Sequence, residues 1–284
     1  MNISVNRRLG ILVALLAVSL SLSAGGAERK AFKVCADPNN LPLSSTHLDG
    51  FENRIAQLLA DDLHLPIAYT WFPQRLGFIR NTLRADDPET GEKKCDIVMG
   101  VPEGFELASP TKPYYRSTYA MVFKKNAGLD DVLMPADILK LDDKRKKALR
   151  FGVFEQTPAA DWLVKYGFVH QITAFPILSG DPNEYPGQLI ERELLGDKID
   201  IAILWGPIAS YYVKKSAPTA ALALLPMQSE PGIKFDFAIA MGVRFGEKEW
   251  KQQVETLIAQ DKEKIEAILK EYQVPLVAED GSPR

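Results

Sequence analysis

Histidine and the common catalytic motifs are scarce or missing in this sequence of 284 residues. Its three histidines, His47, His64 and His170, are scattered without the spacing of a metal site. There is no Gly-x-Ser-x-Gly motif, phosphate-binding glycine loop or His-Glu-x-x-His motif. The acidic pairs Asp61-Asp62 and Asp86-Asp87 are adjacent in sequence, which does not suit an acid/base dyad. We therefore expect a protein that is not an enzyme and that holds no metal or cofactor.

The sequence also lacks an excess of positive charge. It has 34 Lys and Arg against 37 Asp and Glu, a formal net charge of −3 at pH 7. Nucleic-acid binding normally needs a basic surface, so we expect no nucleic-acid partner. The run at residues 142–147 (DDKRKK) mixes both signs and predicts a solvated helix face.

Long uncharged apolar runs are absent except at the N-terminus. Residues 9–22 form such a run, which follows Arg7 and Arg8 and precedes small residues up to Ala27. This is the layout of a secretory signal peptide, and the run is shorter than the roughly 20 residues of a membrane-spanning helix. We predict that residues 1–27 are a signal peptide, and that the cleaved protein lies in the periplasm without membrane insertion. A retained N-terminal anchor is the alternative.

The two cysteines, Cys35 and Cys95, belong to a chain that is predicted to enter an oxidising compartment. One disulfide between them is therefore expected. Cys35 closes the first predicted strand and Cys95 opens the third, and those strands would be neighbours. On the chain-entropy model, closing a loop of this length stabilises a fold by about 4 kcal/mol.

Short β-rich segments alternate with amphipathic helical ones after Ala27, a pattern that favours parallel sheets built from βαβ units. The first set comprises strands at 32–36, 67–72 and 96–100, with helices near 51–63 and 78–83. The second set comprises strands at 151–154, 171–177 and 200–205, with helices that open at Thr157-Pro158, at 188–195 and at Pro207.

Two further β-rich segments, 118–123 and 235–241, lie between these sets, and a helix at 247–272 follows. We predict an α/β fold of two lobes that are joined by two crossing strands. Lobe 1 would comprise 28–117 and 242–284, and lobe 2 would comprise 118–241 with the hinge strands at its ends. Ligands of open α/β sheets bind at the carboxyl ends of strands, which predicts a hinged binding cleft between the lobes.

Six segments resemble a known family: 35–44 (CADPNNLPLS), 50–63 (GFENRIAQLLADDL), 71–83 (WFPQRLGFIRNTL), 95–102 (CDIVMGVP), 113–119 (PYYRSTY) and 200–207 (DIAILWGP). They are similar to the quinoprotein-dehydrogenase-associated solute-binding proteins of the MoxJ/XoxJ type. The resemblance covers essentially the whole mature chain. It implies a type II periplasmic-binding-protein fold. It also implies a role in maturing or activating a periplasmic methanol dehydrogenase that uses pyrroloquinoline quinone (PQQ).

The sequence departs from the broader group of polar amino-acid receptors at two places. Those receptors usually hold the ligand carboxylate with an arginine in a Thr-x-Glu-Arg context, and the ammonium with an aspartate. Here the matching places read PEGFE at 102–106 and Trp205-Gly206-Pro207. Burying a zwitterion without charged partners costs several kcal/mol, so an amino-acid ligand is disfavoured.

The residues expected to line the cleft are mainly aromatic, and they suit an apolar or aromatic guest or a partner's side chains. They are Trp71, Phe72, Tyr114, Tyr115 and Trp205, with Arg75, Arg80, Glu103 and Arg116 as polar contacts and Asp37, Asn39 and Asn40 after the first strand. Burial in the core would explain the aromatic residues equally well, and turn chemistry would explain the Asp37 to Asn40 loop.

Gln156 and Thr157 precede a helix that starts with Pro158. Thr157 can cap that helix and leave backbone N–H groups for an anion, although a cap alone is the alternative. The leading hypothesis for the whole chain is a dehydrogenase accessory protein. The alternative is the receptor of an ABC permease for a small ligand that is not an amino acid. An enzyme such as a dehydratase is a third hypothesis.

Overall fold

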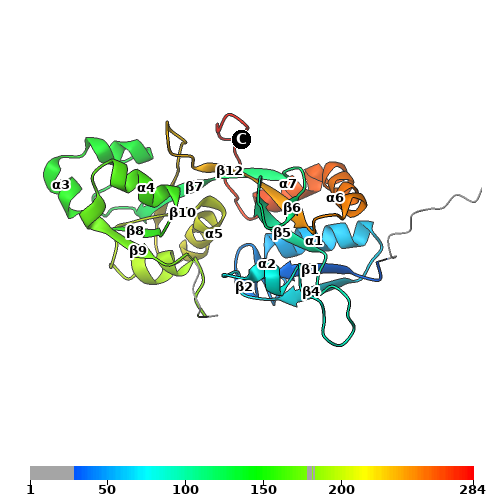
Figure 1. Ribbon diagram of the computed structural model, residues 1–284. Coiled ribbons are helices and arrows are strands. Elements are labelled where there is room, and N and C mark those ends of the chain that lie inside the picture. The colour runs from blue at the N-terminus through cyan, green and yellow to red at the C-terminus, as the bar shows by residue number, and fades with distance from the viewer. Residues whose placement is uncertain (1–28, 178–180, 182) are drawn as a thin grey trace, which may run out of the picture. The chain divides into compact units, whose positions relative to one another are not determined.

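The structure is a computed structural model and describes residues 29–177, 181 and 183–284 (Figure 1). The predicted signal peptide, 1–27, lies outside the described residues. Every helix and strand below belongs to one compact unit, Ala31–Arg284. Within the described ranges, no helix combines the length and the apolar character needed to cross a bilayer.

The first set of elements forms a three-stranded parallel arrangement. Strand β1 lies between β4 and β5 and runs parallel to both, so their carboxyl ends meet at one edge. Helix α1 buries Phe51, Ile55 and Leu59, which recur at helical spacing. The elements are β1 (Phe32–Ala36), β2 (Asn39–Asn40), β3 (Ser44–Ser45), α1 (Phe51–Asp62), β4 (Ile67–Trp71), α2 (Phe78–Asn81), β5 (Ile97–Pro102) and β6 (Ser109–Pro110).

The second set repeats this arrangement. Strand β8 runs parallel to β9 on one side and to β10 on the other. Helix α3 carries the run of mixed charge and has no buried residue, which confirms the predicted solvated face. The elements are β7 (Tyr115–Lys124), η1 (Pro135–Lys140), α3 (Asp143–Ala148), β8 (Phe151–Phe154), α4 (Pro158–Lys165), η2 (Val169–Gln171), β9 (Ile172–Phe175), η3 (Leu189–Leu194), β10 (Ile201–Trp205), α5 (Gly206–Ser216) and β11 (Leu222–Pro226).

Two central strands join the sets. Strand β12 (Asp236–Val243) pairs antiparallel with β5 and with the first half of β7, whereas the second half of β7 pairs with β10 and β11. The sheet therefore has the order β4-β1-β5-β12-β7-β10-β8-β9. The predicted α/β fold with two crossing strands is confirmed.

The C-terminal helix differs from the prediction of one helix at 247–272. It is divided at Asp261 into α6 (Lys248–Gln260) and α7 (Lys262–Glu271). Aspartate is a poor residue for a helix interior, and the buried Asp261 carboxylate accepts a hydrogen bond from Lys264 at 2.7 Å. Both helices share a hydrophobic core with α1, and α7 lies beside α1 (Figure 1).

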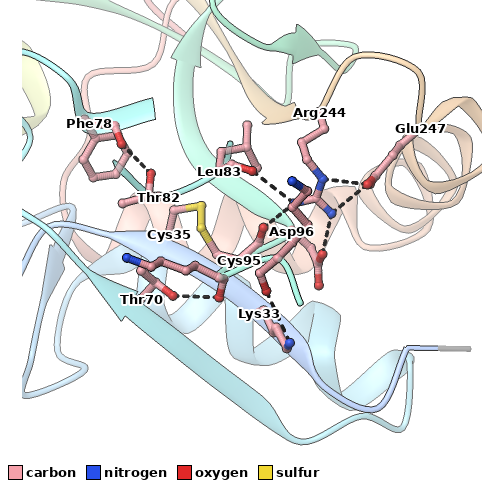
Figure 2. The surroundings of a disulfide bond; sticks show 12 residues. Lys33, Cys35, Thr70, Phe78, Thr82, Leu83, Cys95, Asp96, Arg244 and Glu247 are labelled. Carbon is pink, nitrogen blue, oxygen red and sulfur yellow. Dashed lines mark hydrogen bonds and ion pairs between the residues drawn. A yellow bond between two sulfur atoms is a disulfide. The ribbon is translucent and has the colours of Figure 1, made fainter. Parts of the chain in front are cut away.

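The predicted disulfide between Cys35 and Cys95 is present and buried (Figure 2). It links β1 to Cys95, which lies two residues before the start of β5. Arg244, directly after β12, donates hydrogen bonds to the Asp96 carboxylate at 2.7 Å and to the carbonyls of Cys95 and Leu83. These contacts secure the amino end of β5, opposite the edge where the candidate site lies.

Candidate functional site

The loop after β1 contains the first predicted site residues. The Asp37 carboxylate accepts hydrogen bonds from the backbone N–H groups of Asn39, at 2.8 Å, and Gln74. The buried Asn40 donates from Nδ2 to Gln74 Oε1 at 3.0 Å, whereas Asn39 is exposed. Asp37 and Asn40 therefore join the β1 loop to the loop after β4, at the carboxyl edge of these strands.

Trp71 and Phe72 face different parts of the core, as alternation along a strand requires. The Trp71 ring stacks on Tyr69 with 4.6 Å between ring centroids, and it packs against the core that contains α1. Phe72 packs against the cluster that contains the disulfide, with Arg75 above its ring at 5.3 Å. The structure therefore does not bring Trp71 and Phe72 to one surface.

Tyr114, Tyr115 and Trp205 do come together. The Tyr114 hydroxyl donates to the Met99 carbonyl at 2.9 Å, and its ring lies 4.9 Å from that of Tyr115. The buried Tyr115 hydroxyl accepts a hydrogen bond from the Trp205 indole, and burial raises its pKa well above the usual value. Trp205 ends β10 and packs both against the core that contains α1 and against the core that contains α5. This contact joins the two sets of elements.

Arg116 is paired within the crossing strands. Its Nη1 lies 2.6 Å from the carboxylate of Asp236 in β12, which also accepts a hydrogen bond from Ser229. These hydrogen bonds hold the pKa of Asp236 below its usual value even though its burial acts in the opposite direction. Arg80 and Glu103 are exposed at the surface.

The loop before α4 differs from one expectation. Helix α4 begins at Pro158 after Thr157, as predicted, but the Thr157 side chain does not cap it. Its hydroxyl donates instead to the Phe154 carbonyl at 2.7 Å, so the predicted side-chain cap is wrong. Gln156 is exposed with a left-handed backbone (φ 56°), and the anion site at this turn stays a prediction.

The structure adds one residue that the sequence reasoning missed. Glu52, the second residue of α1, is 8% exposed, and its Oε1 has no hydrogen-bond partner among the described residues. Burial is the main cause that raises the pKa of Glu52 to about 8, and the nearby Asp37 carboxylate adds to it. The carboxyl group lies over Gly100 in β5, where a Cβ would collide with Oε1. The signal in the sequence was a glutamate on the apolar face of α1, in line with Ala56 and Leu59.

The described residues contain no group of three or more His, Cys, Asp or Glu that could hold a metal ion. The candidate site consists of aromatic rings and one buried carboxyl group, that of Glu52, at the carboxyl ends of β1, β5 and β10.

Comparisons with known proteins identify close relatives, although no family model matches the chain. Protein MoxJ of Paracoccus denitrificans is 25% identical over 275 residues, 92% of this chain and 95% of the relative. The crystal structure of the periplasmic binding protein XoxJ from Methylobacterium extorquens AM1 is 34% identical, covers 88% of this chain and 100% of its own, and has a TM-score of 0.67. MxaJ from Methlophaga aminisulfidivorans MPT is 25% identical with coverages of 87% and 100% and a TM-score of 0.68. These similarities confirm the predicted two-lobed type II periplasmic-binding-protein fold.

Proposed function

Because this chain belongs to the MoxJ/XoxJ family of periplasmic binding proteins, which is associated with methanol oxidation, we propose that it binds and helps to mature or activate a PQQ-dependent methanol dehydrogenase. It acts in the periplasm without catalysing a reaction itself. The signal-like N-terminus and the relative described as a periplasmic binding protein support this location. In this proposal β7 and β12 are the hinge between lobe 1, residues 28–117 and 242–284, and lobe 2, residues 118–241.

The observation that carries the proposal is the contact of Tyr115 with Trp205. Trp205 belongs to the segment 205–207 that, by the resemblance, matches the place where polar amino-acid receptors hold the ligand ammonium with an aspartate, which supports a different kind of ligand here. Tryptophan and tyrosine are enriched among interface residues that dominate binding energy. A site of this composition gains its affinity mainly from apolar burial, at about 25 cal/mol per Å². A segment of a protein partner therefore fits it better than a free amino acid does.

The alternative function is the substrate receptor of an ABC transporter for a small ligand that is not an amino acid. Glu52 favours this alternative, because a buried carboxyl oxygen without a partner suits the polar group of a small ligand. In that case the partner would be an ABC permease.

One experiment separates the two functions. The tagged mature protein is incubated with a periplasmic extract that contains the dehydrogenase, and captured proteins are identified by mass spectrometry. A thermal-shift screen of small molecules is run in parallel. Capture of the dehydrogenase and an increase in its activity support the accessory role. Failure to capture it, together with stabilisation by a small molecule, supports the receptor.

A further inference from the structure

We propose that Glu52 is the acidic anchor of a binding site for a cationic nitrogen, an organic ammonium group held between the Glu52 carboxylate and the rings of Tyr69, Tyr114 and Tyr115. The inference names the chemistry that the site proposed above recognises, and so it rests on that site. The ammonium group can belong to a small amine or to a lysine side chain of the protein partner.

Neighbouring parts of the chain fix the position of Glu52. The backbone N–H groups of Phe51 and Glu52 donate to the carbonyls of Pro42, at 2.8 Å, and Leu43, at 2.9 Å, which fixes the start of α1 against the loop after β1. Gly100 leaves the space that the carboxyl group occupies, because any Cβ there would collide with Oε1. The carboxyl group is therefore held over the carboxyl end of β5 by two separate parts of the chain.

Two of the three phenol hydroxyls near Glu52 are occupied elsewhere. The Tyr114 hydroxyl donates to the Met99 carbonyl, and the Tyr115 hydroxyl bonds with Trp205. The phenol rings lie close enough to Glu52 for its charge to raise the pKa of all three hydroxyls. Buried carboxyl oxygens almost always have a hydrogen-bond partner, so the missing partner of Oε1 points to a ligand.

The charges around Glu52 select a cation over an anion. The ionisable groups that act on it or respond to it are Asp37, Tyr69, Tyr114 and Tyr115, and none of these carries positive charge. The faces of aromatic rings also attract cations. Of the arginines predicted here, Arg116 is paired with Asp236 and Arg75 lies over Phe72. A ligand carboxylate would meet the Asp37 carboxylate without a cation to balance it, which disfavours amino-acid zwitterions and favours amines without an acid group.

Protonation gives the site a distinctive property. Because burial raises the pKa of Glu52 to about 8, the empty site holds a proton at neutral pH. An ammonium group favours the ionised carboxylate, so binding releases close to one proton. Affinity then rises about tenfold for each pH unit between pH 6 and pH 7.

The test uses n-butylammonium, which stays charged at both pH values, with 1-butanol and butyrate as its neutral and anionic counterparts. Calorimetry on the purified mature protein at pH 6 and pH 7, in buffers of different ionisation enthalpy, measures affinity and proton release. We expect n-butylammonium to bind about tenfold more tightly at pH 7 with release of close to one proton. The expected affinities for 1-butanol and butyrate are at least tenfold weaker.

Variants assign the effect to Glu52. Glu52→Gln keeps the side-chain volume and should lose both the pH dependence and at least tenfold in affinity, with folding checked by circular dichroism. Gly100→Ala, which displaces the carboxyl group, should also weaken binding. Glu249→Gln, at an exposed position of α6, is the matched control. The proton release of the wild-type protein tests the inference even if a variant fails to fold.

Three outcomes overturn the inference: no binding of n-butylammonium, equally tight binding of 1-butanol, or unchanged binding by a folded Glu52→Gln variant. The capture experiment with the dehydrogenase distinguishes a failure of this inference from a failure of the proposed function. If the wild-type protein captures the dehydrogenase but binds no ammonium, only the present inference falls. If Glu52→Gln loses both ammonium binding and capture, a lysine of the partner is the source of the cation. If only ammonium binding is lost, a small amine is the source.

Discussion

The indole of Trp205, at the end of β10, donates a hydrogen bond to the hydroxyl of Tyr115, at the start of β7. Trp205 also packs edge to face against Tyr119 and Phe237, with ring centroids 5.5 and 6.2 Å apart. These rings come from β10 and from both crossing strands. A change in the angle between the crossing strands therefore alters the surroundings of Trp205, which links the proposed hinge to the candidate site.

Trp205→Ala should weaken the complex with the dehydrogenase by about 2 kcal/mol or more, as truncation of a dominant interface residue does. Tyr115→Phe removes only the hydroxyl and should weaken the complex by about 1 kcal/mol. Binding is measured by surface plasmon resonance at low and high salt, and little salt dependence is expected because the contact is apolar. Phe245→Ala, at a ring that is 60% exposed, is the control. Unchanged binding by folded Trp205→Ala and Trp71→Ala variants would place the partner contact elsewhere.

The disulfide should account for a large part of the stability of the first set of elements. The double variant Cys35→Ala/Cys95→Ala is expected to lose about 4 kcal/mol in free energy of unfolding, measured by urea denaturation. The contacts of Arg244 with Asp96 and Cys95 remain in this variant, so the fold itself should persist. Mass spectrometry of unreduced protein from the periplasm should find no free thiol. Two free thiols would contradict the prediction.

The sequence predicted those elements whose pattern is local. Strand β1 followed from a short β-rich run, whereas the bond between Cys35 and Cys95 followed from the presence of two cysteines in a chain that is predicted to enter an oxidising compartment. The break at Asp261 was missed because Leu257 and Ile265 keep helical spacing across it. Strand β11 was missed because a short apolar run does not distinguish a strand from a helix.

The candidate site depended on contacts that no local pattern contains. The burial of Glu52 requires Gly100, which lies on a different strand far along the chain. Alternation along the strand predicted that Trp71 and Phe72 point to opposite faces. It did not predict that Trp71, rather than Phe72, would pack against the core that contains Tyr115. Aromatic composition could indicate a binding surface, whereas the partners of each ring were set by the sheet order.

Common amino acids should not bind to the isolated protein. Glutamate, glutamine and arginine all carry a carboxylate, which would approach Glu52 and Asp37 without an arginine to balance it. Titration calorimetry at pH 7 is expected to show no micromolar binding of any of them. Micromolar affinity for glutamine would mean that another residue, such as Arg75 or Arg80, serves as the carboxylate partner.

The last prediction concerns how stability depends on pH, and it follows from Glu52 alone. The pKa of Glu52 is raised from 4.5 in the unfolded chain to about 8 in the folded one, so the folded state holds a proton that the unfolded state releases. This stabilising contribution is fully present below pH 4.5 and is lost as the pH rises through about 8. Over the interval between these values, the wild-type protein should lose about 1.4 kcal/mol per pH unit relative to Glu52→Gln, which has no such proton. Urea denaturation of both proteins at pH 5.5 and pH 7 measures the difference, and other ionisable groups cancel because both proteins share them. Parallel stability curves for the two proteins would show that the Glu52 carboxyl group is solvated in solution, and neither its burial nor its role as a proton-linked anchor would stand.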